Sequence, residues 1–336
     1  MTLQKRKTSY GFRVSVVFIA ILAILPLLLK NSPYWLHIGI LCMMYSCYAT
    51  CWNMVAGFTG IFSLGFQALS GIGGYVSSLV AMHMGISPWI SMFIGAICAM
   101  VVGAVFSVPC LKLRLMPYIA ISGMCLGEVV RVIVANLTDL TRGEMGLWGM
   151  PNFTDIGPIS FAGGNRFSYW YLVLIFLIVY LSVVAKIVGS PLGRALGTIR
   201  DSQDAAVALG VNVPQTKVKV YMISAFMMGL IGAFYAHYMQ ILTPTSVIGP
   251  QMMTNIVAMT LFGGLGTITG PILGAFIITI LTETLRFLGD YRLIVYGLII
   301  ILTIIFMRKG LWGTAKPKVL AWVKKMEEKK AAPAAK

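Results

Sequence analysis

The chain alternates long apolar runs with short polar segments, and the runs have the length of membrane spans. A transmembrane helix needs about 20 apolar residues, or about 17 at the short end. The candidate spans are 14–30, 35–56, 61–82, 88–111, 117–136, 168–189, 218–241, 251–265, 268–287 and 291–307. The pattern therefore predicts an all-α, polytopic transmembrane bundle with about ten spans.

Two of these spans are rich in glycine and are expected to be interrupted. The glycines concentrate in segments 57–74 and 263–274, one in each half of the chain. Irregular backbone is tolerated in a membrane only where it is buried in protein or lines a cavity, and paired interrupted spans are typical of transporters with internal repeats. We predict two related halves and a translocation pathway beside Gly65, Gly71, Gly74, Gly263, Gly264 and Gly266. The alternative is that these glycines only let helices pack closely.

The basic residues predict which loops face the cytoplasm. Of the 26 Lys and Arg residues, 20 lie in segments 5–13, 112–114, 186–219 and 308–336. These segments alternate with apolar spans, as cytoplasmic loops do. We therefore expect a cytoplasmic N-terminus (1–13), a transmembrane region (14–307) and a cytoplasmic tail (308–336). Within the transmembrane region, 137–167 is expected outside and 190–217 inside. The net charge of +16 then indicates contact with anionic lipid rather than nucleic acid.

The sequence contains no motif that indicates enzymatic chemistry. It has no GxxxxGK[ST] phosphate loop, no HExxH and no GxSxG. Its six cysteines and three histidines show no metal-ligand spacing. We therefore predict no catalytic residue, no bound metal and no cofactor in this chain.

Glu128 and Arg131 are the charged residues that lie well inside a predicted span. Three residues apart on a helix, they share a face and can form an ion pair. A charge at the bilayer centre costs roughly 2.5–3.5 kcal/mol, so such residues usually mark functional sites. We predict that they face the interior of the bundle and shape the outer part of the pathway. A purely structural pair near the outer end is the alternative.

The polar loop 190–217 contains a predicted helix of about two turns. Asp201 or Ser202 can cap its start, Asp204 adds negative charge in its first turn, and Gly210 can end it with a positive φ. A helix this short is marginal alone in water, so the rest of the protein must hold it. A short helix held between spans predicts a contact surface for a soluble partner.

Several blocks of sequence resemble one family of permeases. Asp204-Ala205-Ala206 followed by Gly210 is similar to the "EAA…G" loop of ABC importer permeases, with Asp in place of Glu. Four blocks match in family-like order and spacing: NMVAGFTGIFSLGFQALSGIGGY, GRALGTIRDSQDAAVALGVNVP with the span after it, AMTLFGGLGTITGPILGAF, and LRFLGDYRLIVYGLIIILTIIFMRKGLWG. Across roughly residues 35–313, the chain resembles the LivM-type permease subunits of branched-chain amino acid ABC transporters.

This resemblance implies a type II importer-like permease in the inner membrane of a bacterium. The implied partners are a homologous second permease, two ATPase subunits that bind the ATP, and a substrate-binding protein. The loop helix would dock in a groove of an ATPase subunit, with Ala205 and Ala206 against the groove. Arg194 and Arg200 are further candidates for this contact.

Two further predictions concern the remaining basic residues and the outer loop. Lys217 and Lys219 are expected to anchor the chain at lipid headgroups. The segment TRGEMGLWGMP at 141–151 resembles a Gly-rich "TGGxDGLxGIP" segment of the family, which Gly143, Gly146 and Gly149 match. Met145 stands where the family commonly has Asp, and Glu144 also departs from the pattern.

Three functions therefore remain open at this point. The leading one is an importer subunit for branched-chain amino acids, and urea, short amides or aromatic acids are alternative substrates within the same family group. A secondary transporter driven by H⁺ or Na⁺ would need an intramembrane carboxylate, for which Glu128 is the candidate, although Arg131 would hold its proton off. A membrane enzyme is disfavoured because the chain lacks the catalytic motifs.

Overall fold

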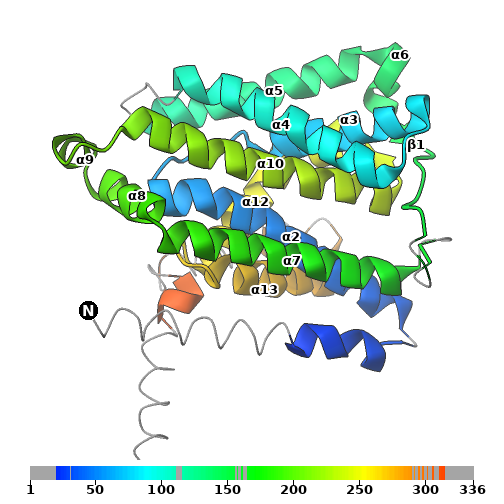
Figure 1. Cartoon of the computed structure of the whole chain (residues 1–336). Coiled ribbons are helices and arrows are strands. Elements are labelled where there is room, and N and C mark those ends of the chain that lie inside the picture. Colours follow the sequence, from blue (N-terminus) through cyan, green and yellow to red (C-terminus); the bar gives the residue numbers. More distant parts are fainter. Residues whose placement is uncertain are drawn as a thin grey trace, which may run out of the picture.

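The structure is a computed structural model that describes residues 20–314 apart from 31, 111–115, 156, 158–159, 162–164, 290, 292–293, 296, 299–300, 302–304 and 306–309. In this part of the chain, helices lying side by side form the body of the molecule (Figure 1). They are α2 (Pro33–Thr59), α3 (Phe66–Met84), α4 (Pro88–Cys110), α5 (Met116–Asn136), α7 (Arg166–Gly189), α10 (Val213–Met239), α12 (Pro250–Gly263) and α13 (Gly270–Thr284).

Successive helices of the body run in opposite directions, so their connections gather at two ends (Figure 1). One end, called here the α9 end, holds α8 (Pro191–Asp201), α9 (Gln203–Ala208) and the turns 60–65 and 264–269. The other end, called the β1 end, holds α6 (Thr138–Thr141), η1 (Gly143–Met145), β1 (Leu147–Trp148), β2 (Ile241–Leu242) and α11 (Pro244–Val247), and η3 (Leu285–Leu288) follows α13. The two strands pair antiparallel, with Leu147 opposite Leu242.

Close backbone contacts at glycine residues hold α10 against α3, and similar contacts hold α3 against α4. A Cβ atom on Gly73 of α3 would lie 2.2 Å from the carbonyl oxygen of Gly229 on α10. Nearby, a Cβ on Gly232 would lie 2.1 Å from the carbonyl oxygen of Ser70, and one on Gly95 of α4 would lie 2.4 Å from that of Gly73. Small residues let helices in a membrane approach this closely and gain dispersion contacts.

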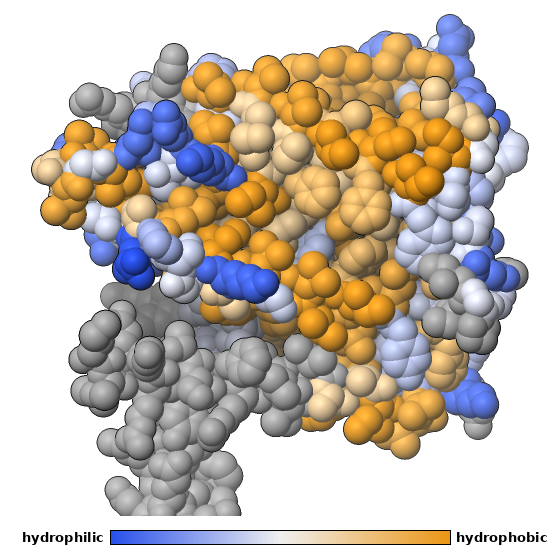
Figure 2. Space-filling view, in the orientation of Figure 1, coloured by the Kyte–Doolittle hydropathy of each residue, from blue (hydrophilic) through white to orange (hydrophobic). Residues whose placement is uncertain are grey.

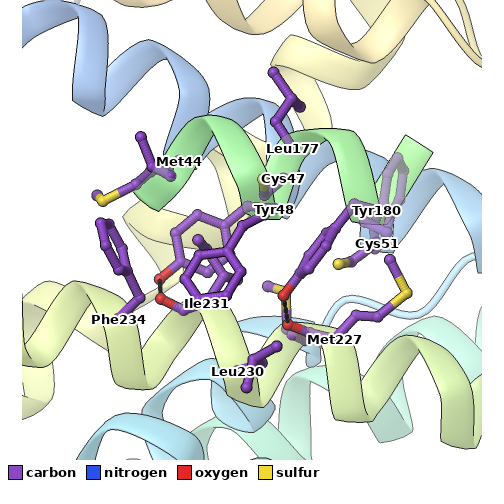
Figure 3. Close-up of a cluster of buried hydrophobic side chains, with 14 of the residues drawn as sticks. Met44, Cys47, Tyr48, Cys51, Leu177, Tyr180, Met227, Leu230, Ile231 and Phe234 are labelled. Carbon is purple, nitrogen blue, oxygen red and sulfur yellow. Dashed lines mark hydrogen bonds between the residues drawn. The ribbon is translucent and has the colours of Figure 1, made fainter. Parts of the chain in front are cut away.

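Helix α2 is the most buried of the long apolar helices, and tyrosine hydroxyls link its surroundings to α10. Figure 3 shows Tyr48 of α2 and Tyr180 of α7 pointing toward α10. Tyr48 donates to the carbonyl oxygen of Ile231 at 3.5 Å, and Tyr180 donates to that of Met227. A buried phenol needs such an acceptor, so these bonds favour one arrangement of the three helices.

Six of the described helices are long and apolar enough to cross a membrane: Pro33–Thr59, Pro88–Cys110, Pro117–Asn136, Arg166–Gly189, Val213–Met239 and Gly270–Phe287. Helix α3 begins only at Phe66 and is not among them, and neither is α12, which has 14 residues. The predicted spans 14–30 and 291–307 extend outside the described residues. The all-α membrane architecture is therefore confirmed, and ten spans stays a prediction.

The surface agrees with a membrane environment. In Figure 2 apolar side chains form a broad band over the body, and hydrophilic ones concentrate toward its two ends. Large apolar residues on the outward faces of α4, α5 and α7 are exposed, for example Val105, Ile121 and Ile175. Apolar surface this wide is what lipid tails cover.

We expect Gly232→Ala to destabilise the protein, because its new methyl group would collide with the backbone of Ser70. Overpacking of this kind costs about 1–3 kcal/mol. The apparent Tm of the purified protein in detergent measures the effect. Gly197→Ala, in α8, is the matched control, since nothing lies within 4 Å of the added Cβ. A Tm unchanged in both variants would contradict the packing argument.

Candidate functional site

The polar segment after α7 folds as two helices, of which the sequence predicted only the second. The side chain of Ser190 accepts a hydrogen bond from the backbone N–H of Gly193, and Pro191 occupies the first helical position of α8. Leu196 is buried in the core of the body, and Ile199 is buried in a small separate cluster beside it. The Ser-Pro start and the apolar spacing of residues 192, 196 and 199 were the signal for α8 that sequence reasoning missed.

Helix α9 starts and ends as the sequence predicted. The hydroxyl oxygen of Ser202 accepts from the N–H of Ala205 at 3.3 Å and caps the helix. Gly210 has a φ of 79°, and the N–H of Val211 reaches back to the carbonyl oxygen of Ala206 at 3.0 Å. This left-handed turn ends the helix. Helix α9 has six residues, fewer than the two turns expected.

Ala206 lies inside this chain, which corrects the prediction that its side chain faces a partner. It is fully buried in a small apolar cluster with Ile199, Val211 and Val213. Helix α8 supplies Ile199, and the start of α10 with the residues just before it supplies Val213 and Val211, so Ala206 holds α9 against its own chain. A bulky residue there would disturb the loop before it met any partner.

Two exposed apolar residues lie on α9 and directly after it, and sequence reasoning did not select them. Val207 is 60% exposed and Leu209 is 74% exposed. Asp204 and Ala205 are exposed beside them. Figure 1 shows that α9 projects beyond the ends of the neighbouring helices. An apolar tip held in this way suits docking of a soluble protein.

The basic residues of the segment differ in their surroundings. Arg194 is exposed on α8, whereas Nη1 of Arg200 donates to the carbonyl oxygen of Gly57 at 3.3 Å. Lys217 is only 1% exposed, so the prediction that it anchors at lipid headgroups is wrong. It lies one turn before Tyr221, whose ring packs on the body, and it shares that inward face of α10. Lys219 is exposed.

The two glycine-rich segments meet directly at the α9 end. The amide of Asn53 on α2 donates through Nδ2 to the carbonyl oxygen of Thr267 at 2.8 Å, and its Oδ1 accepts from the N–H of Gly266 at 2.8 Å. A Cβ on Gly57, one turn further along α2, would lie 2.5 Å from the nitrogen of Gly266. The prediction selected the glycines but missed the asparagine that joins their segments.

The other glycines predicted to line a pathway lie at packed contacts; they are Gly65, Gly71, Gly74, Gly263 and Gly264. For example, a Cβ on Gly65 would lie 2.1 Å from the carbonyl oxygen of Gly123 on α5, and one on Gly71 would lie 2.2 Å from Cγ1 of Ile248. The structure thus shows the close packing that was the alternative interpretation. Their part in a pathway stays a prediction.

Glu128 and Arg131 form the predicted ion pair, and Glu144 joins it. Nη2 of Arg131 lies 2.5 Å from Oε1 of Glu128, and its Nη1 lies 3.2 Å from Oε1 of Glu144. The side chain of Glu128 is 52% exposed, so the prediction that the pair faces the interior of the bundle is wrong. Gly123 and Gly127 are buried on the opposite face of α5, and that face packs against the body.

The outer loop is fastened to the end of α10. Gly143, Gly146 and Gly149 all have positive φ, between 60° and 78°. A Cβ on Gly146 would lie 2.4 Å from the carbonyl oxygen of Leu242, which also accepts from the hydroxyl of Tyr75 at 2.9 Å. The guanidinium of Arg142 stacks over Trp148, 4.3 Å from the ring centre. The loop is therefore an ordered feature of the β1 end.

The histidines and cysteines form no metal-binding group of three or more with acidic residues in the described part of the chain. Buried His237 instead makes two structural bonds. Its Nδ1 donates to the carbonyl oxygen of Pro151 at 2.9 Å, and its Nε2 accepts from the hydroxyl of Ser77 at 2.9 Å. These bonds tie the segment after the outer loop to α3 and α10.

An apolar belt, antiparallel helices and a helix pair projecting from one end together define a multi-pass helical membrane protein. Residues 34–304 match the family described as "Branched-chain amino acid transport system / permease component", and the chain belongs to this family. It is therefore one component of a transport system.

Individual relatives point to more than one substrate. The chain is 26% identical to the high-affinity branched-chain amino acid transport system permease protein LivM of Escherichia coli, over 84% of this chain and 71% of that protein. It is 28% identical to the ribose import permease protein RbsC of Bacillus subtilis, over 47% of this chain and 54% of that one. A probable ABC transporter permease, y4mJ of Sinorhizobium fredii, is 28% identical over 45% of each chain. No solved structure matches the chain.

Arg131→Gln is expected to harm assembly more than Glu128→Gln. Losing Arg131 leaves the carboxylates of Glu128 and Glu144 without their cation, whereas losing Glu128 leaves Arg131 paired with Glu144. An unpaired charge at low dielectric is more costly than no charge. The amount of complex recovered from membranes measures the difference.

The double variant Glu128→Gln/Arg131→Gln is the control for that comparison. It should recover more complex than Arg131→Gln alone, because it removes both charges of the closest pair. Additive losses in the double variant would mean that the two residues act independently.

Proposed function

We propose that the chain is the permease subunit of an ATP-driven ABC importer and forms half of its transmembrane pathway. The observation that carries the proposal is the projecting α9, which its own chain holds in place, with exposed Val207 on the helix and exposed Leu209 directly after it. Family membership supplies the transport class. Energy for transport would enter through this surface from an ATPase subunit.

The α9 end is then the cytoplasmic end, in the inner membrane of a bacterium. Lys186, Arg194, Arg200 and Lys219 lie at or beside the polar segment, and basic residues of this kind favour the cytoplasmic side. Both termini are cytoplasmic in this orientation. The β1 end, with its ordered Gly-rich loop, faces outward and receives the substrate-binding protein.

The proposed complex contains this chain, a homologous second permease, two ATPase subunits and the binding protein. ATP is the only cofactor, and the ATPase subunits bind it, since this chain has no phosphate loop. Closure of the ATPase pair on ATP moves α9 and, with it, the helices of the body.

The exposed face of α5 is the side on which we place the pathway. Glu128 and Arg131 lie on this face, well within the span Pro117–Asn136. Charged side chains within a span are costly in lipid, and they usually face protein or water-filled space. A second permease packed against this face would keep lipid away from the pair and would keep it at low dielectric.

Branched-chain amino acids are the substrates that we assign. Among the relatives described above, the branched-chain amino acid permease matches 84% of the chain and the ribose permease matches 47%. Urea, short amides, aromatic acids and sugars are the alternatives. An ion-coupled secondary transporter is the rival mechanism, and it would need no docking surface at α9.

Transport by the purified complex tests this function. The complex captured through this chain is placed in liposomes, its subunits are identified by mass spectrometry, and uptake of radiolabelled leucine and ribose is measured. We expect leucine uptake that requires the binding protein, and ATP on the side that α9 faces. Uptake driven by an H⁺ or Na⁺ gradient without ATP would overturn the proposal.

Leu209→Ser and Val207→Ser are expected to weaken capture of the ATPase subunit about tenfold, since central apolar residues dominate binding at such interfaces. Both side chains are exposed, so folding should be unaffected. Titration of the detergent-solubilised chain with the ATPase subunit gives the Kd. Met145→Ser, at an apolar residue 84% exposed at the opposite end, is the matched control. Equal affinity for all variants would place the docking surface elsewhere.

A further inference from the structure

Three segments from distant parts of the chain meet beside the base of α8 and α9. They are the last turns of α2, the turn 264–269 between α12 and α13, and the end of α8. Asn53 joins the first two through bonds to Gly266 and Thr267. Arg200 joins α8 to the first through the carbonyl oxygen of Gly57. The three segments form what we call the inner junction.

Arg200 reaches both other parts of the inner junction. A Cβ on Gly266 would lie 3.2 Å from Nη1 of Arg200 and 3.0 Å from the carbonyl oxygen of Gly57. The guanidinium therefore lies over the backbone of Gly266 while it bonds to Gly57. Its Nε also lies 3.6 Å from Oδ1 of Asp201, but both side chains are exposed, so this ion pair contributes little to holding the guanidinium.

The chemistry of this contact suits an arginine. The last carbonyl groups of a helix lack intrahelical partners and carry the negative end of the helix dipole. Arg200 supplies a donor and a positive charge to this end of α2. The planar guanidinium can donate to the carbonyl of Gly57 while it lies against the backbone of Gly266, which a single ammonium on a flexible stem does less well.

Helix α9 is mechanically connected to Arg200. Ala206 of α9 packs on Ile199 of α8, and Ile199 is the residue before Arg200. Ser202 both ends α8 and caps α9, so no flexible linker separates the two helices. A displacement of α9 is therefore passed to Ile199 and to the guanidinium of Arg200.

We propose that Arg200 transmits the movement of α9 to the inner junction and so controls the cytoplasmic opening of the pathway. The inference rests on the proposed function, since it needs an ATPase that moves α9. Arg200 is a positioning residue that touches neither ATP nor the transported molecule. When α9 moves, Arg200 pulls on the end of α2 and on the backbone at Gly266, and the turn 264–269 shifts relative to α2.

The experiment compares Arg200→Ala, Arg200→Lys and Lys219→Ala with the unaltered chain in the reconstituted complex. Lys219→Ala is the control, because Lys219 is an exposed basic residue beside the same polar segment but lies on α10, outside the α8–α9 pair. Three quantities are measured: the amount of ATPase captured, the rate of ATP hydrolysis, and the uptake of whichever of leucine and ribose the unaltered complex takes up.

Arg200→Ala should still capture the ATPase and hydrolyse ATP, while uptake per ATP hydrolysed falls at least about fivefold, the lower end of typical coupling between sites. Arg200→Lys should recover part of the ratio, because it keeps one donor and the charge. Lys219→Ala should leave the ratio unchanged.

Two results would overturn the inference alone: an unchanged ratio in Arg200→Ala, or loss of assembly in Arg200→Ala, which would show a purely structural role. An unaltered complex whose uptake does not depend on ATP is a different result. It would overturn the proposed function, and this inference with it.

Discussion

The contact of α10 with α3, backbone to backbone at glycine, is the interaction on which the rest of the structure depends. Gly73, Gly229 and Gly232 leave no room for a side chain, and this closeness places α10 in the middle of the body. Helix α10 has 27 residues, which gives a length of about 40 Å. Its first turn carries the α8–α9 pair and its last turn leads into β2. One helix, held by glycine contacts, thus positions the features of both ends.

Hydrogen bonds from side chains to backbone carbonyl groups favour one arrangement of the helices, which apolar packing alone does not do. Lipid tails are as apolar as the helix surfaces, so burial alone hardly distinguishes one helix arrangement from another in a membrane. Trp52 donates to the carbonyl oxygen of Ser63 at 2.8 Å, and Ser224 donates to that of Cys51 at 2.6 Å. Asn53 and Tyr180 bond in the same way. Because unsatisfied polar groups are costly without water, each bond favours one arrangement of the two segments that it joins.

Arg131 and Arg200 lie toward opposite ends of the molecule and differ in their surroundings. At the β1 end, Arg131 gathers Glu128 and Glu144 on the exposed face of α5, where another subunit or water has to meet them. At the α9 end, Arg200 bonds to the end of α2, within this chain. Arg131 reaches from α5 to Glu144 in the short segment η1, and Arg200 reaches from α8 to the end of α2. Burial of apolar surface does not hold such segments, so charge-assisted bonds contribute more to their order.

The sequence by itself determined the membrane class, the helical architecture, the family and the left-handed turn at Gly210, because apolar periodicity, glycine spacing and capping residues are local properties of a chain. It also determined that Glu128 and Arg131 pair, since they are one turn apart. Tertiary structure decided which way each side chain points. The inward face of Ala206, the burial of Lys217 and the exposure of Glu128 depend on which neighbour packs on each helix. The bonds of Asn53 and Arg200 join residues separated by 143 positions or more, and no local pattern encodes a partner at that distance.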